Sequence, residues 1–428
     1  MTGKFNDAGC LSSLFALGVF ALGAAGVAQA QSVTLSLPAQ VGQKLFFDAT
    51  LSASKQMSCA SCHDPNNHYA PSNALPVQLG GPNLNIAGTR AVPTLTYKDY
   101  IPPYSDLLPN PDGDSPPAPG GGFMWDGRAP TLADQAALPL LASNEMANAS
   151  KDAVVQAVKI SSYADLFKQA FGAAVLDDTD AAFADVGAAL QAYQLEDPSF
   201  HPYSSKYDLY SSNKIGGDLT AAEASGLRVF MDPNRGNCFA CHFSGAGYNG
   251  SVAQFTDYSF EAIGVPRNTS IAANATRLGA PSFYDMGLCS RADHPLPAGK
   301  EYCGMFKTPT LRNVATRQAF FHNGVFHTLS DVIHWYNTRD SNPEKWYPTV
   351  KGVVQKFNDL PTGYHGNIDT QMPLDGRPAG STPPMSDQDM ADLEAFLNTL
   401  TDGYVPPAQQ PQARVAVRTP AVLAGNSK

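Results

Sequence analysis

The sequence predicts a mainly α-helical protein made of two similar halves with long loops. Three segments, 151–171, 180–195 and 386–400, place apolar residues at three- and four-residue steps, which is the period of an amphipathic helix. Related stretches recur about 190 residues apart, a period far too long for a repeat solenoid. The recurrence therefore indicates two domains of one kind.

Length and charge limit the class of protein. The 428 residues are 43% hydrophobic and 15% charged, so the chain can bury a sizeable core. A net charge of −10 argues against nucleic acid as a partner, because binding phosphates requires a basic surface. A basic protein partner or a small neutral substrate fits this charge better.

Residues 1–30 have the pattern of a secretory signal peptide. Lys4 precedes a long apolar run, and Ala28-Gln29-Ala30 is a small-residue cleavage site. The alternative, a retained membrane anchor, is weakened by the small residues that dilute the run. We therefore expect a periplasmic protein that is cleaved near Ala30 and has no membrane span in its mature chain.

Two copies of C-x-x-C-H, in MSCASCHDP and NCFACHFSG, predict two covalently bound haem c groups. In this pattern two thiols bond the haem vinyl groups and the adjacent imidazole reaches the iron. The alternatives are a dithiol redox pair and a zinc site, which would require four converging ligands. The predicted attachment residues are Cys59 and Cys62 with the iron ligand His63, and Cys238 and Cys241 with the iron ligand His242.

Of the other cysteines, Cys10 is removed with the signal peptide. Cys289 and Cys303 remain, within the segment 243–306, which is rich in Pro, Gly and Asn and is predicted to be a loop. The segment 97–122 has the same character. Because an exported chain meets an oxidising compartment, we expect a disulfide between these two cysteines.

The internal duplication aligns three pairs of stretches. These are LFFDATLSASKQMSCASCH (45–63) with LRVFMDPNRGNCFACH (227–242), VPTL (92–95) with TPTL (308–311), and FMWDGRAPTLADQA (123–136) with FFHNGVFHTLSDVI (320–333). The last pairing places Thr131 on Thr328 and Pro139 on Tyr336. The predicted organisation is a signal peptide (1–30), two haem domains (37–205 and 218–402) and a disordered tail (403–428).

The stretch FHTLSDVIHWYN (326–337) predicts a helix that begins after Thr328, with Asp331 completing a capping pair. Helical spacing predicts a buried face made of Leu329, Val332, Ile333 and Tyr336. His327 and His334 fall on the opposite side. We expect both histidines to be solvated and not to bind iron.

With these motifs, the chain resembles the bacterial di-haem cytochrome c peroxidase and MauG family over about residues 37 to 402. The resemblance implies two cytochrome c-like domains, with an N-terminal haem that meets peroxide and a C-terminal haem that stores or relays an electron. Partners implied are H2O2 and a protein electron donor or protein substrate.

The resemblance also implies residue roles near the N-terminal haem. Glu145 matches the distal acid, which can take a proton from bound H2O2 and return it to the leaving oxygen. Gln135 matches a glutamine on the same side, and Trp125 matches a tryptophan between the haems that can carry an electron. Without the resemblance, these would be a surface glutamate, a helix-face glutamine and a core tryptophan.

Tyr336 occupies the position of a methionine ligand in the peroxidase branch and of a tyrosine in MauG. A phenolate oxygen is a hard donor that stabilises ferric iron, so the resemblance implies a C-terminal haem of low potential with His242 and Tyr336 as ligands. The alternative is a core tyrosine beside the haem. Pro139, at the matching position of the first half, cannot bind iron and should leave that haem open to peroxide.

Two departures limit the resemblance. The family often holds calcium through an asparagine at the position of Ala91, so this chain lacks one ligand and calcium binding stays open. MauG also uses a surface tryptophan where this chain has Gly236, so the substrate of MauG does not transfer. The leading hypothesis is a MauG-like peroxidase; the alternatives are a peroxidase that draws on a small cytochrome and an electron-transfer cytochrome without turnover.

Overall fold

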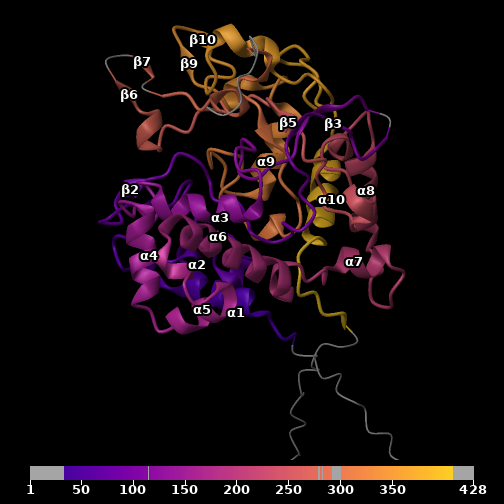
Figure 1. Ribbon diagram of the computed structural model, residues 1–428. Coiled ribbons are helices and arrows are strands. Elements are labelled where there is room, and N and C mark those ends of the chain that lie inside the picture. The colour runs from indigo at the N-terminus through magenta and orange to yellow at the C-terminus, as the bar shows by residue number, and fades with distance from the viewer. Residues whose placement is uncertain (1–32, 114, 278–279, 282, 292–299, 408–428) are drawn as a thin grey trace, which may run out of the picture. The chain divides into compact units, whose positions relative to one another are not determined.

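The computed structural model describes residues 33–113, 115–277, 280–281, 283–291 and 300–407. The predicted signal peptide and most of the predicted tail lie outside these residues. The described chain is mainly helical, with long loops and small two-stranded sheets, as the sequence predicts (Figure 1).

The helices fall into two groups along the chain. The first group is α1 (Leu37–Phe47), α2 (Cys59–Cys62), α3 (Leu132–Leu141), α4 (Lys151–Lys159), α5 (Ala164–Phe171) and α6 (Thr179–Glu196). The second group is α7 (Lys206–Ser211), α8 (Ala221–Met231), α9 (Leu329–Thr338) and α10 (Asp387–Asn398). Each group encloses a hydrophobic core of its own: one core draws on residues between 41 and 200, the other on residues between 207 and 400.

The strands of the described chain are short and pair antiparallel within the loops. The pairs are β1 (Leu79–Gly80) with β2 (Ile86–Ala87), β3 (Ser105–Leu108) with β4 (Ala118–Gly120), β5 (Phe260–Glu261) with β8 (Phe306–Lys307), β6 (Thr276–Arg277) with β7 (Ala280–Pro281), and β9 (Thr349–Val350) with β10 (Val353–Val354). The pairing of β5 with β8 closes the long loop that also contains the Cys289–Cys303 disulfide, which confirms that prediction.

The two groups of helices repeat the same close crossing. Helix α1 packs on α6, and α8 packs on α10 (Figure 1). A Cβ at Gly42 would lie 1.9 Å from the carbonyl oxygen of Ala189, and a Cβ at Gly226 would lie 1.9 Å from that of Asp392. Both crossings therefore require glycine, since any side chain would force the backbones apart.

We expect Gly226→Ala to destabilise the protein by about 1 to 3 kcal/mol, because the added methyl group overpacks the crossing of α8 and α10. Thermal unfolding of the holoprotein measures the change. Gly363→Ala is the matched control, because a Cβ at Gly363 meets nothing within 4 Å. Equal melting temperatures for the two variants would contradict the tight crossing.

The duplication extends to the segments that lead into α3 and α9. Phe123 forms an isolated bridge with Ala129, as Phe320 does with Phe326. The side chain of Thr131 then caps α3, and the side chain of Thr328 caps α9. The predicted alignment of these stretches and the predicted cap at Thr328 are confirmed.

Two details of the helices differ from the prediction. The segment 151–171 forms two helices, α4 and α5, because the Ser161 hydroxyl donates to the Val158 carbonyl and turns the chain between them. In α9 the predicted face is correct, but Trp335 is also fully buried, against Val265 and Leu374. Helix α9 is therefore covered on two sides.

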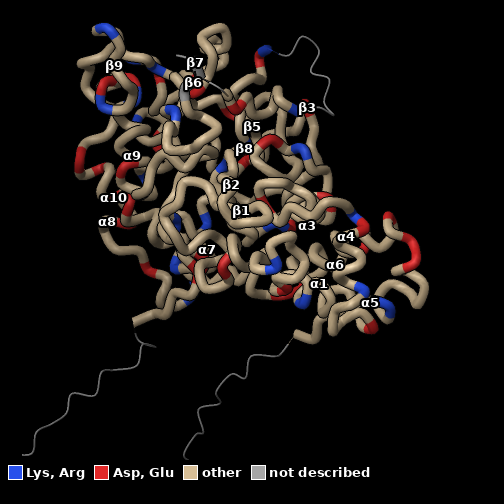
Figure 2. Tube along the Cα trace, turned by 90° about the vertical axis from the view of Figure 1, so that its left-hand side faces the viewer, with Lys and Arg blue, Asp and Glu red and all other residues tan. Residues whose placement is uncertain are grey.

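Charged residues of both signs are spread along the described chain. Figure 2 shows Lys and Arg interspersed with Asp and Glu along the chain trace, and the net charge is −10. Within the described residues, no helix is long and apolar enough to cross a membrane.

Candidate functional site

Both C-x-x-C-H motifs adopt the same local geometry. The backbone N–H of His63 donates to the Cys59 carbonyl at 2.9 Å, and that of His242 donates to the Cys238 carbonyl at 2.8 Å. Each imidazole places Nδ1 beside a backbone carbonyl, Tyr69 at 3.1 Å and Phe255 at 3.0 Å. Because a carbonyl only accepts, Nδ1 must carry the hydrogen, which leaves the Nε2 lone pair of each ring for a metal.

Burial keeps both imidazoles neutral. It lowers the pKa of His63 to about 4 and the pKa of His242 to about 4. Above that range neither ring carries the second proton that would block Nε2. Both histidines are therefore suited to bind iron throughout the neutral range.

The two motifs open onto one cavity of about 430 Å³. Its wall includes all six predicted attachment residues: Cys59, Cys62, His63, Cys238, Cys241 and His242. The four thiols form no disulfide. A cavity lined by both motifs contains the thiols and imidazoles required to attach and ligate two haem groups.

The charges in the cavity wall fit the propionate carboxylates of haem. The ammonium of Lys98 has no hydrogen bond or ion pair with the described residues, while Lys307 donates to the Gly122 carbonyl and Arg317 to those of Val92 and Ala319. Burial, followed by the charge of Arg317, lowers the pKa of Lys98 to about 8, and burial lowers the pKa of Lys307 to about 7. Such cations require anionic partners, which propionates would supply.

We expect Lys98→Met to lower the reduction potential of the haem attached at His63. The charge of Lys98 acts on His63, and removing a nearby cation disfavours the reduced, less positive iron by about 1 kcal/mol or more. Spectroelectrochemical titration measures the shift. The exposed Lys44, changed to Met, is the control, and an equal shift in that variant would contradict the assignment.

One face of α3 carries the predicted distal glutamine. Gln135, Ala136 and Pro139 line the cavity from successive turns of this helix, which Thr131 caps. Pro139 lies inside the helix and offers the cavity only carbon atoms. This wall of the cavity therefore presents an amide but no iron ligand at the position of Pro139.

Glu145 lies in the turn after α3, where both its backbone N–H and its backbone carbonyl are hydrogen-bonded. Its N–H donates to the Ala142 carbonyl at 2.9 Å, and its carbonyl accepts from the Gly81 N–H at 2.8 Å. The side chain lines the cavity and is accessible through it, yet protein surrounds the carboxyl. The resulting desolvation raises the pKa of Glu145, and the charge of Arg128 partly offsets this rise.

Trp125 links the two halves of the chain. Its indole N–H donates to the Ala91 carbonyl at 2.8 Å, and its own carbonyl accepts from the Lys307 N–H at 2.9 Å. The Ala91 N–H in turn donates to the His322 carbonyl at 2.7 Å. The ring lines the cavity that contains both haem motifs, and the N–H and carbonyl of Ala91 are both used in these contacts.

Tyr336 lines the cavity from α9, together with Leu329, Val332 and Ile333. The pKa of its hydroxyl is raised, first by burial and then by the charges of the free Cys241 and Cys238 thiolates. A phenolate is therefore disfavoured there unless a cation binds the oxygen directly. His327 and His334 do not line the cavity, and both place Nδ1 beside backbone carbonyls, as expected for histidines outside the site.

Three cationic residues of the cavity wall were not predicted from the sequence. Lys98, Lys307 and Arg317 are far apart in the sequence, but each lies within six residues of VPTL or TPTL, the stretches that the duplication singles out. Their closeness to these repeated stretches could have indicated that they lie near the haem motifs. The structure brings the three cations into one cavity wall.

The repeated fold, the two C-x-x-C-H motifs and their shared cavity define the class of di-haem c-type peroxidases. The family model "Di-haem cytochrome c peroxidase" matches residues 38–215. The methylamine utilization protein MauG of Paracoccus denitrificans is 33% identical over 92% of this chain and 95% of its own. Cytochrome c551 peroxidase of Pseudomonas aeruginosa is 27% identical over 69% of this chain and 70% of its own.

A solved structure shares this architecture. The diheme peroxidase BthA of Burkholderia thailandensis is 37% identical, with a TM-score of 0.76 over 87% of this chain and 87% of that chain. The chain therefore belongs to the di-haem cytochrome c peroxidase and MauG family. It is a peroxidase with two haem c cofactors.

Proposed function

We propose that the protein is a periplasmic MauG-like peroxidase that reduces H2O2 at the N-terminal haem and draws electrons through the C-terminal haem from a protein donor or substrate. The observation that carries the proposal is one cavity whose wall contains both haem motifs together with Glu145, Gln135 and Tyr336. In this proposal, domains 37–205 and 218–402 each attach one haem.

A haem held by Cys59, Cys62 and His63 would supply the iron for cleavage of the peroxide O–O bond. Glu145 would take a proton from one peroxide oxygen and return it to the other, the leaving oxygen, which departs as water. Gln135 orients the peroxide by hydrogen bonding, and Pro139 keeps the binding position open. Trp125 lines the same cavity. In this proposal its ring passes electrons between the two haems.

Tyr336 distinguishes the MauG-like mode from detoxification. As an iron ligand it would hold the C-terminal haem in the ferric state, so the resting protein would react with peroxide without prior reduction. The second candidate function, a peroxidase that draws on a small cytochrome, is favoured by the similarity to cytochrome c551 peroxidase. That function would require a reduced haem first.

Addition of peroxide to the all-ferric holoprotein tests the proposal. A rapid change of the Soret band in the absence of reductant is expected. A change seen only after one-electron reduction would favour the cytochrome-fed peroxidase, and no change in either state would favour an electron carrier without turnover. Mass spectrometry of the exported protein should show a chain that begins near Gln31.

A further inference from the structure

The tyrosines that line the cavity differ in what their hydroxyl groups contact. Among the described residues these tyrosines are Tyr97, Tyr258 and Tyr336. Tyr336 is the proposed iron ligand, and the buried hydroxyl of Tyr258 has no hydrogen-bond partner among the residues that the structure describes. The hydroxyl of Tyr97 donates to Oδ2 of Asp402 at 2.6 Å. Of the three, Tyr97 alone has a carboxylate in position to receive its proton.

The acceptor matters because a phenol that loses an electron becomes strongly acidic. The electron leaves readily only when the proton can leave with it, and proton transfer requires an acceptor within hydrogen-bond distance. Trp125, the tryptophan in the wall of this cavity, donates its N–H to a backbone carbonyl, which cannot take up a proton. Tyr97 combines contact with the cavity and a proton acceptor.

We propose that Tyr97 is a redox-active residue that carries oxidising equivalents out of the haem cavity, with Asp402 as its proton acceptor. The proposal rests on the peroxide chemistry proposed above. One electron passes from Tyr97 to the peroxide-oxidised haem pair. The phenol O–H bond breaks and the proton bonds to Oδ2 of Asp402, which leaves a neutral phenoxyl radical and a carboxylic acid. An electron from an external donor and the return of that proton restore Tyr97.

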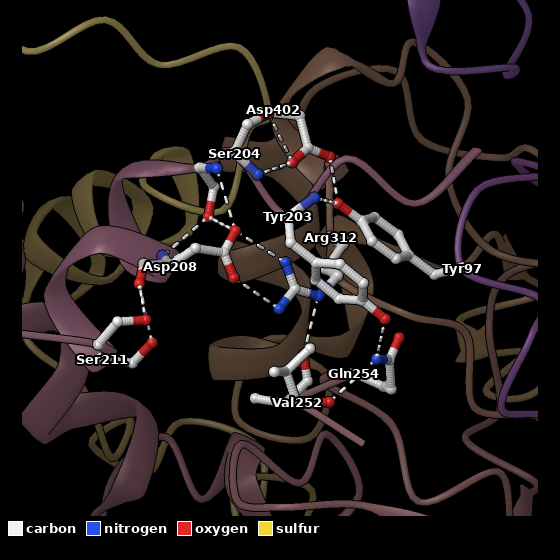
Figure 3. Close-up of polar contacts among 12 residues, drawn as sticks. Tyr97, Tyr203, Ser204, Asp208, Ser211, Val252, Gln254, Arg312 and Asp402 are labelled. Carbon is white, nitrogen blue, oxygen red and sulfur yellow. Dashed lines mark hydrogen bonds and ion pairs between the residues drawn. The ribbon is translucent and has the colours of Figure 1, made fainter. Parts of the chain in front are cut away.

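The position of Asp402 is fixed by further hydrogen bonds (Figure 3). Figure 3 shows the Ser204 N–H donating to Oδ1, at 2.9 Å. Oδ2 also accepts from the Asn313 side chain at 2.8 Å. The Tyr203 N–H donates to the hydroxyl oxygen of Tyr97 at 3.1 Å. These contacts hold the phenol and the carboxylate in one geometry, so the proton needs to move only along an existing hydrogen bond.

When Tyr97 loses an electron, the charge of Arg312 favours loss of the Tyr97 proton over a ring that keeps a positive charge. Its guanidinium carbon lies 4.8 Å from the ring centroids of both Tyr97 and Tyr203. A cation over a ring interacts favourably with the neutral aromatic group and repels a positively charged one. Oxidised Tyr97 is therefore stabilised when its proton has moved to Asp402.

Tyr203 continues the path outward (Figure 3). Its ring centroid lies 4.9 Å from that of Tyr97. Tyr97 is 2% exposed, whereas Tyr203 is partly exposed. An external electron donor can therefore reduce Tyr97 through Tyr203 without entering the cavity.

Electron paramagnetic resonance of the holoprotein, frozen soon after peroxide is added, tests the proposal. The wild type should give a tyrosyl signal that narrows when the protein contains ring-deuterated tyrosine. Tyr97→Phe should lose this signal while the Soret change persists. Tyr163→Phe is the matched control: the hydroxyl of Tyr163 donates to Asp48 at the same distance of 2.6 Å, but the residue does not line the cavity, so the signal should remain.

Asp402→Asn tests the proton acceptor separately, because the ring of Tyr97 stays in place while the amide cannot take up the proton. The tyrosyl signal should be lost in this variant too, and thermal unfolding would show whether the fold is retained. A tyrosyl signal that persists in Tyr97→Phe, or a wild-type Soret change without any tyrosyl signal, would overturn the role of Tyr97 alone. No Soret change in the wild type would overturn the peroxide chemistry as well.

Discussion

Glu145→Gln is expected to slow the reaction of the all-ferric holoprotein with H2O2 by about 10²- to 10⁴-fold, the usual contribution of a positioned general acid–base group. Glutamine keeps the size of the side chain but can neither take the peroxide proton nor return it. Stopped-flow absorbance in the Soret region measures the rate. The haem attachment residues are untouched, so the resting spectrum should be unchanged.

Glu261→Gln is the matched control for this variant. Glu261 also lines the cavity, and burial raises its pKa to about 8, but its charge acts on Cys241 of the second haem motif. The control should react with peroxide at nearly the wild-type rate. Equal slowing in both variants would show that the rate depends on the total charge of the cavity and not on Glu145.

The pH dependence of the same rate follows from the direction of the Glu145 pKa. Desolvation raises this pKa, so the carboxylate is lost at a higher pH than for an exposed glutamate. Because the carboxylate is the base, the rate should fall as the pH is lowered through the raised pKa. Glu145→Gln should abolish this limb of the profile.

Tyr336→Phe is expected to convert the C-terminal haem from low-spin to high-spin ferric iron and to raise its reduction potential. The phenyl ring fills the same space but removes the oxygen that would bind iron. Electron paramagnetic resonance and absorbance of the resting holoprotein measure the spin state, and a redox titration measures the potential.

Two variants serve as controls for Tyr336. Tyr258→Phe removes another hydroxyl from the cavity wall, one that has no hydrogen-bond partner among the described residues. His334→Ala removes a possible nitrogen ligand from the same helix, α9. Both should keep the low-spin spectrum. A change in His334→Ala together with none in Tyr336→Phe would make the histidine the ligand.

The haem motifs were predictable because covalent attachment fixes the spacing of the residues in sequence. The cap at Thr328 was predictable for a similar reason, since it depends on residue types at short separations. The Cys289–Cys303 disulfide was predictable because these were the two cysteines left outside the haem motifs of an exported chain. The duplication was visible because both halves keep the same cap and bridge before α3 and α9.

Contacts between distant segments could not be read in this way. Trp335 follows the helical pattern of α9 poorly, and it is buried because a later segment containing Leu374 packs on it. Similarly, Asp402 lies in the stretch that begins after α10, and nothing near it in sequence indicates a hydrogen bond to Tyr97. Such pairings depend on the packing of the whole chain.

The crossing of α1 with α6 sets an order of assembly as the polypeptide emerges N-terminus first. Every residue of the first core precedes residue 201, so this half can become compact while the second half is still being made. The cavity wall, in contrast, includes Lys307 and Tyr336, and Asp402 reaches Tyr97 last of all. The environment for peroxide chemistry is therefore complete only when the second half has packed as well.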